Sequence, residues 1–214
     1  MAYDALHQRT GLFGGTGVGL TADTWSFDGT RWTILVPAGT GRPTVRVGPA
    51  MAFDPLRGQI VMFGGRSTTN TALDETWILE NLTWRLAVPS ARPSARSDAA
   101  IAFDGTRGTA VLSGGFGPSS NTTDTWEWDG TTWFSPSIAS PTARQAAAMA
   151  YDSAARRMTI FGGNTGTSQV VYVGDTWVRN STSLDAPTFT THPQSIGAAT
   201  NEPIEFSVIA SNAL

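Results

Sequence analysis

The sequence predicts an all-β protein built from four repeated units, each folded as a small sheet of four strands. Two observations predict this fold. A pair of tryptophans seven residues apart recurs along the chain, as in Trp126 and Trp133, with Asp-Gly or Glu-Asn between them. A pair of glycines also follows an apolar run in each unit, as at Gly64 and Gly65. Because Asp-Gly is typical of two-residue type I′ hairpin turns, we expect each tryptophan pair to lie on two adjacent strands.

The repeated residues align in register over four units. The glycine pairs are Gly14, Gly15, Gly64, Gly65, Gly114, Gly115, Gly162 and Gly163. The tryptophans are Trp25, Trp32, Trp77, Trp84, Trp126, Trp133 and Trp177, and Leu184 stands at the eighth position. Successive copies lie 48 to 52 residues apart, and a period of this length with several short strands indicates blades of a β-propeller. The units cover about residues 1–48, 49–98, 99–146 and 147–184.

The residue pattern of each unit predicts four strands in a fixed order. In the first strand, as in 50–53, Met51 and Phe53 alternate with alanines, which predicts an inner strand with one large-residue face. The second strand, as in 60–63, is continuously apolar and so buried on both faces. The third and fourth strands carry the tryptophans, which pack between neighbouring blades. Burial of one aromatic side chain contributes about 2–3 kcal/mol, so Leu184 predicts a weak outer strand in the fourth unit.

The longest polar connections fall on one side of this arrangement. In a four-stranded meander, the loops from the second to the third strand and the links between blades share one face. These loops are residues 66–73, 116–123 and 164–174, and together with the links they form what we call the long-loop face. Binding residues concentrate on long loops held by a rigid scaffold, so we expect any binding site there.

The periodicity ends at residue 184. We expect a linker and then the first strands of a second, incomplete β domain in residues 185–214, because Ile204, Phe206 and Val208 alternate with polar residues. About thirty residues cannot form an independent β-sandwich.

Composition excludes several function classes. The 214 residues include no cysteine, which excludes disulfides, thiolate metal sites and cysteine nucleophiles. The only histidines, His7 and His192, lie far apart in the sequence, so we expect neither a metal nor a cofactor. All fourteen basic residues are Arg, and they balance the acidic residues of 1–184, which argues against a nucleic-acid partner. No apolar run reaches the length of about 20 residues that a membrane span needs.

With these motifs in view, residues 1–184 resemble the kelch repeat, in the bacterial variety similar to the central domain of galactose oxidase. The glycine pair after an apolar strand and the aromatic–six residues–Trp spacing carry the resemblance. It implies a ring of six or seven blades, of which this chain would supply four, and a location outside the cell or on its surface. The tail from 187 to 214 resembles the opening of an immunoglobulin-like domain. A galactose-oxidase copper site would require a cysteine-linked tyrosine, which a chain without cysteine cannot form.

The chain departs from related repeats beside the inner strands. Such repeats often carry an arginine followed by a histidine there. The arginine is present as Arg46, Arg96 and Arg144, whereas the histidine position holds Pro49, Ala99 and Ala147. Any family role that depends on an imidazole is therefore in doubt.

The best candidates for a binding site are Arg46, Arg66, Arg96 and Arg144 on the long-loop face. A closed ring would direct several guanidiniums towards the mouth of the central channel, where their planar donors suit carboxylates and polyhydroxy ligands. In the alternative, each repeated arginine binds backbone carbonyls of the neighbouring blade and cements the ring. Loop asparagines such as Asn121 could bind a sugar or could be solvated loop residues.

These residues favour a non-catalytic binding or display module that recognises a protein or a carbohydrate through the long-loop face. In one alternative, the blades support a propeller enzyme, an oxidase or a sugar-converting enzyme, whose catalytic residues lie outside this segment. In another, they form a structural spacer of a surface protein. We expect no catalytic residue within the segment itself, and the sequence leaves the oligomeric state open.

Overall fold

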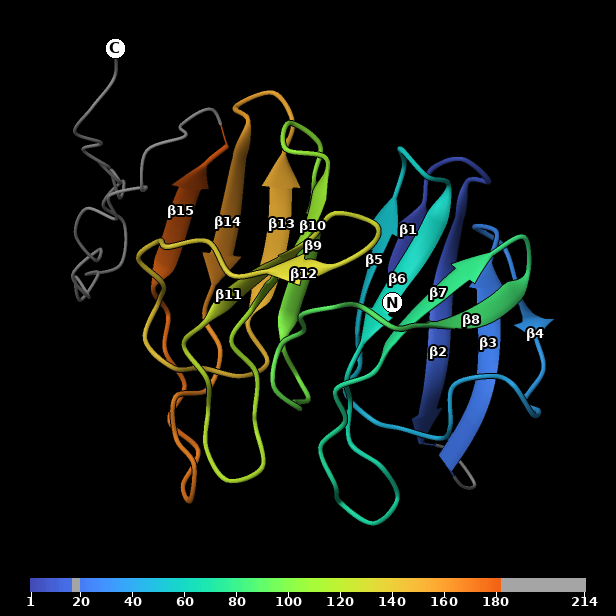
Figure 1. Cartoon of the computed structure of the whole chain (residues 1–214), viewed down its shortest axis with the longest axis horizontal. Helices are drawn as coiled ribbons and strands as arrows, with labels where there is room; N and C mark the ends of the chain where they lie inside the picture. Colours follow the sequence, from blue (N-terminus) through green and yellow to red (C-terminus); the bar gives the residue numbers. More distant parts are fainter. Residues whose placement is uncertain (17–19, 182–214) are drawn as a thin grey trace, which may run out of the picture.

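The fold consists entirely of antiparallel β-sheets in the computed structural model, which describes residues 1–16 and 20–181 (Figure 1). Four sheets, each a meander in which every strand pairs with the next, correspond to the four predicted units. This confirms the predicted all-β propeller arrangement. Among the described residues, no helix is long and apolar enough to cross a membrane.

Each sheet forms one blade, and the strands follow the predicted order. Blade 1 contains β1 (Ala2–Asp4), β2 (Arg9–Thr16), β3 (Leu20–Phe27) and β4 (Trp32–Val36). Blade 2 contains β5 (Ala50–Asp54), β6 (Gln59–Phe63), β7 (Thr76–Glu80) and β8 (Thr83–Ala87). Blade 3 contains β9 (Ala100–Asp104), β10 (Thr109–Ser113), β11 (Thr125–Trp128) and β12 (Trp133–Phe134). Blade 4 contains β13 (Ala148–Asp152), β14 (Arg157–Phe161) and β15 (Thr176–Asn180).

Blade 4 therefore has three strands within the described residues, where the sequence predicts four. The position of the expected outer strand, around Leu184, lies outside these residues, as do the linker and the second domain predicted for 185–214. The weak outer strand and the domain boundary stay predictions.

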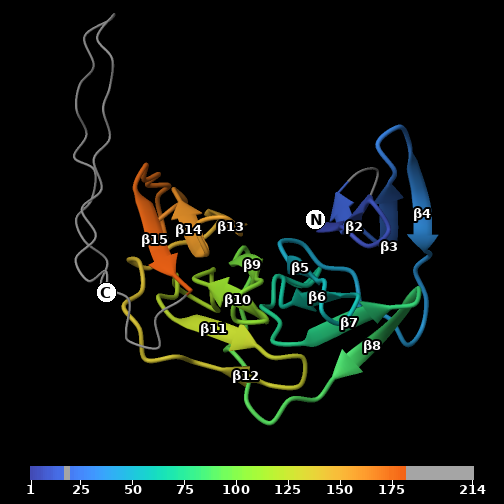
Figure 2. The ribbon, with the colours of Figure 1, turned by 90° about the horizontal axis from the view of Figure 1, so that it is seen from above.

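The blades form an open arc around their first strands. Strands β1, β5, β9 and β13 are neighbours at the inner side, and the outer strands β4, β8 and β12 lie at the periphery (Figure 2). Blades 1 and 4 stand on opposite sides of the opening (Figure 2). The long loops 66–73, 116–123 and 164–174 project from one edge of the arc, and the first-to-second turns lie at the opposite edge (Figure 1).

The core consists of two apolar layers, one between blades 1 and 2 and one between blades 2 and 3. Met51 and Phe53 of β5 pack into the first layer, whereas Ala50 and Ala52 pack into the second, as the alternation predicts. All five residues of β6 are buried, because blade 2 is covered on both faces. The fourth-strand residues Trp84 and Trp133 are also buried between blades.

One predicted turn is wrong in detail. The hairpin at Asp129 and Gly130 is a loop over residues 129–132, and only Gly130 has positive φ there, at 103°. The Asp129 carboxylate accepts the backbone N–H groups of Thr131 and Thr132, which closes the loop without a type I′ turn. Positive φ at two consecutive residues occurs instead at Asn81 and Leu82, between β7 and β8.

Candidate functional site

The three repeated arginines lie immediately before the inner strands of blades 2, 3 and 4, where the blade links enter the arc. Arg46, Arg96 and Arg144 are all buried. Their guanidiniums are enclosed by the blades. Each arginine lies eighteen residues before the first glycine of its blade's glycine pair, so the repeat builds the same environment three times.

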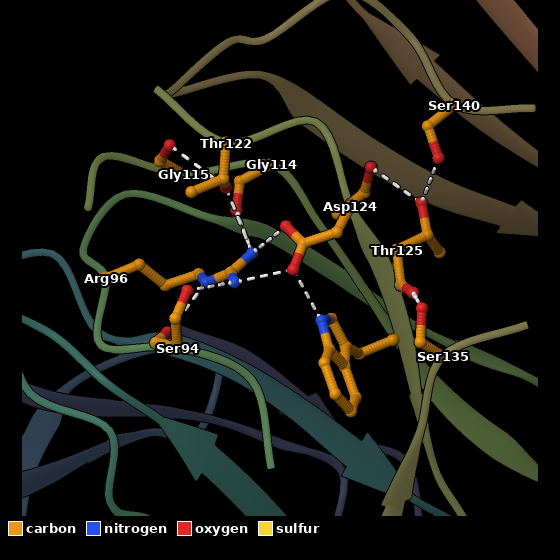
Figure 3. Close-up of polar contacts among 11 residues, drawn as sticks. Ser94, Arg96, Gly114, Gly115, Thr122, Asp124, Thr125, Ser135 and Ser140 are labelled. Carbon is orange, nitrogen blue, oxygen red and sulfur yellow. Dashed lines mark hydrogen bonds and ion pairs between the residues drawn. The ribbon is translucent and has the colours of Figure 1, made fainter. Parts of the chain in front are cut away.

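The environment of Arg96 shows the arrangement (Figure 3). Its two terminal nitrogens bind both carboxylate oxygens of Asp124 at 2.5 and 2.8 Å, which is the bidentate geometry of a strong ion pair. Nη1 also donates to the Gly114 carbonyl at 3.1 Å, and Nε donates to the Ser94 carbonyl at 2.9 Å. The indole of Trp126 donates to the same carboxylate at 2.6 Å. The guanidinium donors of Arg96, which we expected to bind a ligand, are therefore bound to other groups of the protein.

Blades 2 and 4 repeat this network. Arg46 binds Glu75 at 2.7 Å, and Arg144 binds Asp175 at 2.6 Å. Both arginines also donate to the carbonyl of the first glycine of their blade, at 3.1 Å in blade 2 and 2.9 Å in blade 4. The acidic residue always directly precedes the third strand, so the ion pair fixes the entry of that strand against the blade link.

The backbones of Arg96 and Arg144 connect their blades to the preceding ones. The Arg96 carbonyl accepts the Gly65 N–H of blade 2 at 2.9 Å, and the Arg144 carbonyl accepts the Gly115 N–H of blade 3 at 2.8 Å. Gly64, with φ +67°, has no room for a side chain, because a Cβ would lie 2.3 Å from the Arg96 carbonyl oxygen. In the alternative hypothesis, each guanidinium would bind backbone carbonyls of the neighbouring blade. In the structure the guanidinium binds its own blade and the carbonyl makes the contact between blades.

Each of these ion pairs lowers the pKa of its carboxyl group. The Arg144 hydrogen bond outweighs burial and, with that of Trp177, lowers the pKa of Asp175 to about 2. Burial alone would raise the pKa of Asp124 and of Glu75, but hydrogen bonds from the paired arginine and the adjacent indole lower both below their usual values. Burial lowers the pKa of Arg46, and Glu75 partly offsets that effect. All three acids are therefore ionised partners of their arginines at neutral pH.

The long loops are braced against one another by side chains. Arg66, the fourth predicted binding residue, donates from Nη2 to the Gly117 carbonyl of the next long loop at 3.1 Å, and its guanidinium lies 4.9 Å from the Phe116 ring centroid. Asn121 in turn donates from Nδ2 to the Asn164 carbonyl at 3.1 Å. Loops 66–73, 116–123 and 164–174 thus form one connected surface rather than three independent loops.

Loop 164–174 presents an apolar cluster that the sequence reasoning missed. Val170, Val171 and Tyr172 are exposed, and Tyr172 is 81% exposed. The loop is held from within, because the Asn164 side chain accepts the Gly166 and Val171 N–H groups. The signal was available in the sequence as a Val-Val-Tyr-Val run within an otherwise polar loop. We call Val170, Val171 and Tyr172 the loop cluster.

A separate hollow of about 400 Å³ lies between blades 1 and 2 and is lined by Asp4, His7, Arg9 and apolar side chains that include Phe53 and Leu82. Its polar groups bind one another, since Asp4 accepts hydrogen bonds from Arg9 and pairs with the His7 ring at 2.8 Å. Within the described ranges, no group of three or more His, Cys, Asp or Glu residues could hold a metal ion. His192 lies outside those ranges.

The model of the KLHDC2/KLHL20/DRC7 Kelch-repeats domain matches residues 2–195. The chain belongs to the kelch-repeat family. The match covers all four blades and continues past residue 184, where the sequence predicts the end of the propeller. No curated protein matches the chain. Kelch-repeat domains are typical protein-interaction propeller modules, which is the functional class that family membership indicates for this kelch domain.

Proposed function

We propose that this kelch domain is a non-enzymatic interaction module that binds a protein partner through the long-loop face, with the loop cluster as its anchor. The single observation that carries the proposal is the exposure of Val170, Val171 and Tyr172 together on a braced loop. Exposed apolar side chains gathered in one place are typical of interaction surfaces, and tyrosine is enriched among the residues that dominate binding energy.

Preorganisation of the loops supports the same conclusion. A loop that is already ordered loses less conformational entropy on binding than a free one. The hydrogen bonds from Arg66 to Gly117 and from Asn121 to Asn164 hold adjacent loops in register before a partner arrives. In this proposal Arg66 contributes by ordering the surface.

The buried arginines contribute to the interaction only indirectly. Arg46, Arg96 and Arg144 are saturated by carboxylates and carbonyls, so a partner would have to displace an internal ion pair to reach them. We therefore assign recognition to the loop cluster. The three buried arginines fix the ends of the long loops, and Arg144 does so for the loop that carries the cluster, through Gly162 and Asp175.

A site-specific photo-crosslinking experiment tests the proposal. A photoreactive amino acid is placed at Tyr172 and, as a matched control, at Leu56, which is 67% exposed and belongs to the first-to-second turn between β5 and β6. We expect one defined protein to crosslink at position 172 and not at position 56. With that partner purified, Tyr172→Ala should raise the Kd by about 10-fold or more, whereas Leu56→Ala should leave it unchanged. Crosslinking at position 56 alone, or a glycan as the captured ligand, would overturn the proposal.

A further inference from the structure

The hollow between blades 1 and 2 combines an apolar wall with basic side chains that keep free donors. We propose that it binds a small organic acid, a carboxylate on an apolar body, through Arg9 and His7. Its volume of about 400 Å³ falls within the range of pockets that bind small molecules. This inference does not depend on the protein partner proposed above.

The next interface along the chain shows why this space is open. Between blades 2 and 3, Arg57 binds Asp54 of its own blade at 2.7 Å and also crosses to blade 3. Its Nη1 reaches the Gly108 carbonyl at 3.4 Å, and its guanidinium packs over Gly130. One long side chain therefore fills the gap between blade 2 and two turns of blade 3.

Blade 1 has a shorter side chain at this position. His7 stands where blade 2 has Arg57, and its ring binds Asp4 of its own blade at 2.8 Å. The two turn positions that Arg57 contacts in blade 3 are held in blade 2 by Gly58 and Asn81, and both line the hollow. The hollow is thus the space that an arginine fills at the next interface.

The buried Asp4 carboxylate holds both basic side chains through one nitrogen of each. It accepts the Nε–H of Arg9 at 3.2 Å and pairs with Nδ1 of His7 at 2.8 Å. Within the described ranges, the two terminal nitrogens of Arg9 and Nε2 of His7 have no hydrogen-bond partner. The paired N–H groups of a guanidinium match the two oxygens of a carboxylate.

The charges of these groups suit an acid that brings its own proton. Asp4 already balances the charge of Arg9. An organic acid supplies one carboxylate and one proton, and the proton can pass to Nε2 of His7. The imidazolium then donates from Nδ1 to Asp4 and from Nε2 to the ligand, because both ring nitrogens of a protonated histidine are donors.

Apolar side chains provide the rest of the site. Phe53, Ile60 and Leu79 line the hollow and belong to the core layer between blades 1 and 2, so they form a rigid wall. Leu82, in the turn between β7 and β8, also lines it and is 52% exposed. A ligand that covers these side chains removes apolar surface from water, which favours an acid with an aromatic or aliphatic body.

Binding of phenylacetate to the whole chain is the first test. Acetate, which lacks the apolar body, and phenylacetamide, which lacks the carboxylate, are the controls. In ¹H–¹⁵N NMR titrations, the backbone N–H signals of Gly58, Asn81 and Leu82 should shift and saturate. We expect a Kd of about 1 mM or below for this ligand of about ten non-hydrogen atoms, and at least about 10-fold weaker binding of each control. No saturable shift up to about 10 mM, or equal binding of either control, would overturn the proposal.

Removal of the guanidinium locates the carboxylate. Arg9→Gln should weaken phenylacetate binding by at least about 10-fold, because it removes the charged fork. The matched control Arg157→Gln changes the same position of blade 4, where the arginine side chain is 48% exposed, and should leave the Kd unchanged. An unchanged Kd for Arg9→Gln, or equal losses in both variants, would overturn the assignment.

The variant His7→Arg distinguishes a shaped site from a general attraction of anions. The new side chain takes the position of Arg57 and should fill the hollow without loss of the fold, which circular dichroism can verify. Phenylacetate binding should therefore be lost although a positive charge has been added. Unchanged or tighter binding would show that charge alone attracts the acid and would overturn the proposal.

Discussion

Replacement of Arg96 by leucine tests the role that the structure gives to the repeated arginines. The substitution keeps an apolar stem but removes the donors to the Ser94 and Gly114 carbonyls and to Asp124. A buried carbonyl left without a donor costs about 1–3 kcal/mol. Loss of one partner from a buried ion pair costs about 3–5 kcal/mol, but the Asp124 side chain is 37% exposed and regains water. We therefore expect the free energy of unfolding to fall by about 3 kcal/mol.

Urea unfolding followed by tryptophan fluorescence measures this change, with Arg85→Leu on the exposed side of β8 as the control. The effect should be larger for Arg144→Leu, because the carboxylate of Asp175 is only 12% exposed and is less able to recover hydration. Binding of a partner identified at Tyr172 should be retained by the folded Arg96→Leu protein. A loss below about 1 kcal/mol, or a loss of binding without a loss of stability, would refute the structural role and restore the arginine-site hypothesis.

Three further substitutions test a glycine, a buried ion pair and a carboxyl group elsewhere in the blades. Gly64→Ala should lower the free energy of unfolding by more than about 2 kcal/mol in urea titrations, because Gly64 has positive φ and a Cβ there would clash with the next blade. The control Gly174→Ala has open space for the Cβ and should change the free energy of unfolding by less than about 1 kcal/mol. Replacing both Glu127 and Arg179 by leucine should be less destabilising in thermal melts than replacing Glu127 alone, since the single change leaves a buried cation unpaired; equal losses would contradict this. The pKa of Asp175 is lowered in the folded state, so its stabilisation is complete above its usual pKa and is lost as the pH falls from about 4 to about 2. Asp175→Asn should therefore flatten the dependence of stability on pH in that window, and an unchanged acid-unfolding curve would count against it.

The sequence alone determined that four repeated blades are present, the order of the described strands within them, and the packing faces of inner strands such as β5. These features depend on local patterns that recur in register, such as the alternation at Met51 and Phe53 and the glycine pair at Gly64 and Gly65. Because the same pattern occurs in register in four units, a chance match within one unit does not change the strand assignment. The family match over residues 2–195 agrees with this assignment.

The tertiary structure decided how the repeated residues are used. The sequence shows that Arg96 recurs at a fixed distance from Gly114, but not that its guanidinium turns inward to Asp124 while its carbonyl binds the preceding blade. Likewise, the sequence marks Trp32 and Trp133 as equivalent. Only the packing of the blades leaves one exposed and buries the other, because exposure depends on which neighbour covers a face and not on the residue that occupies it.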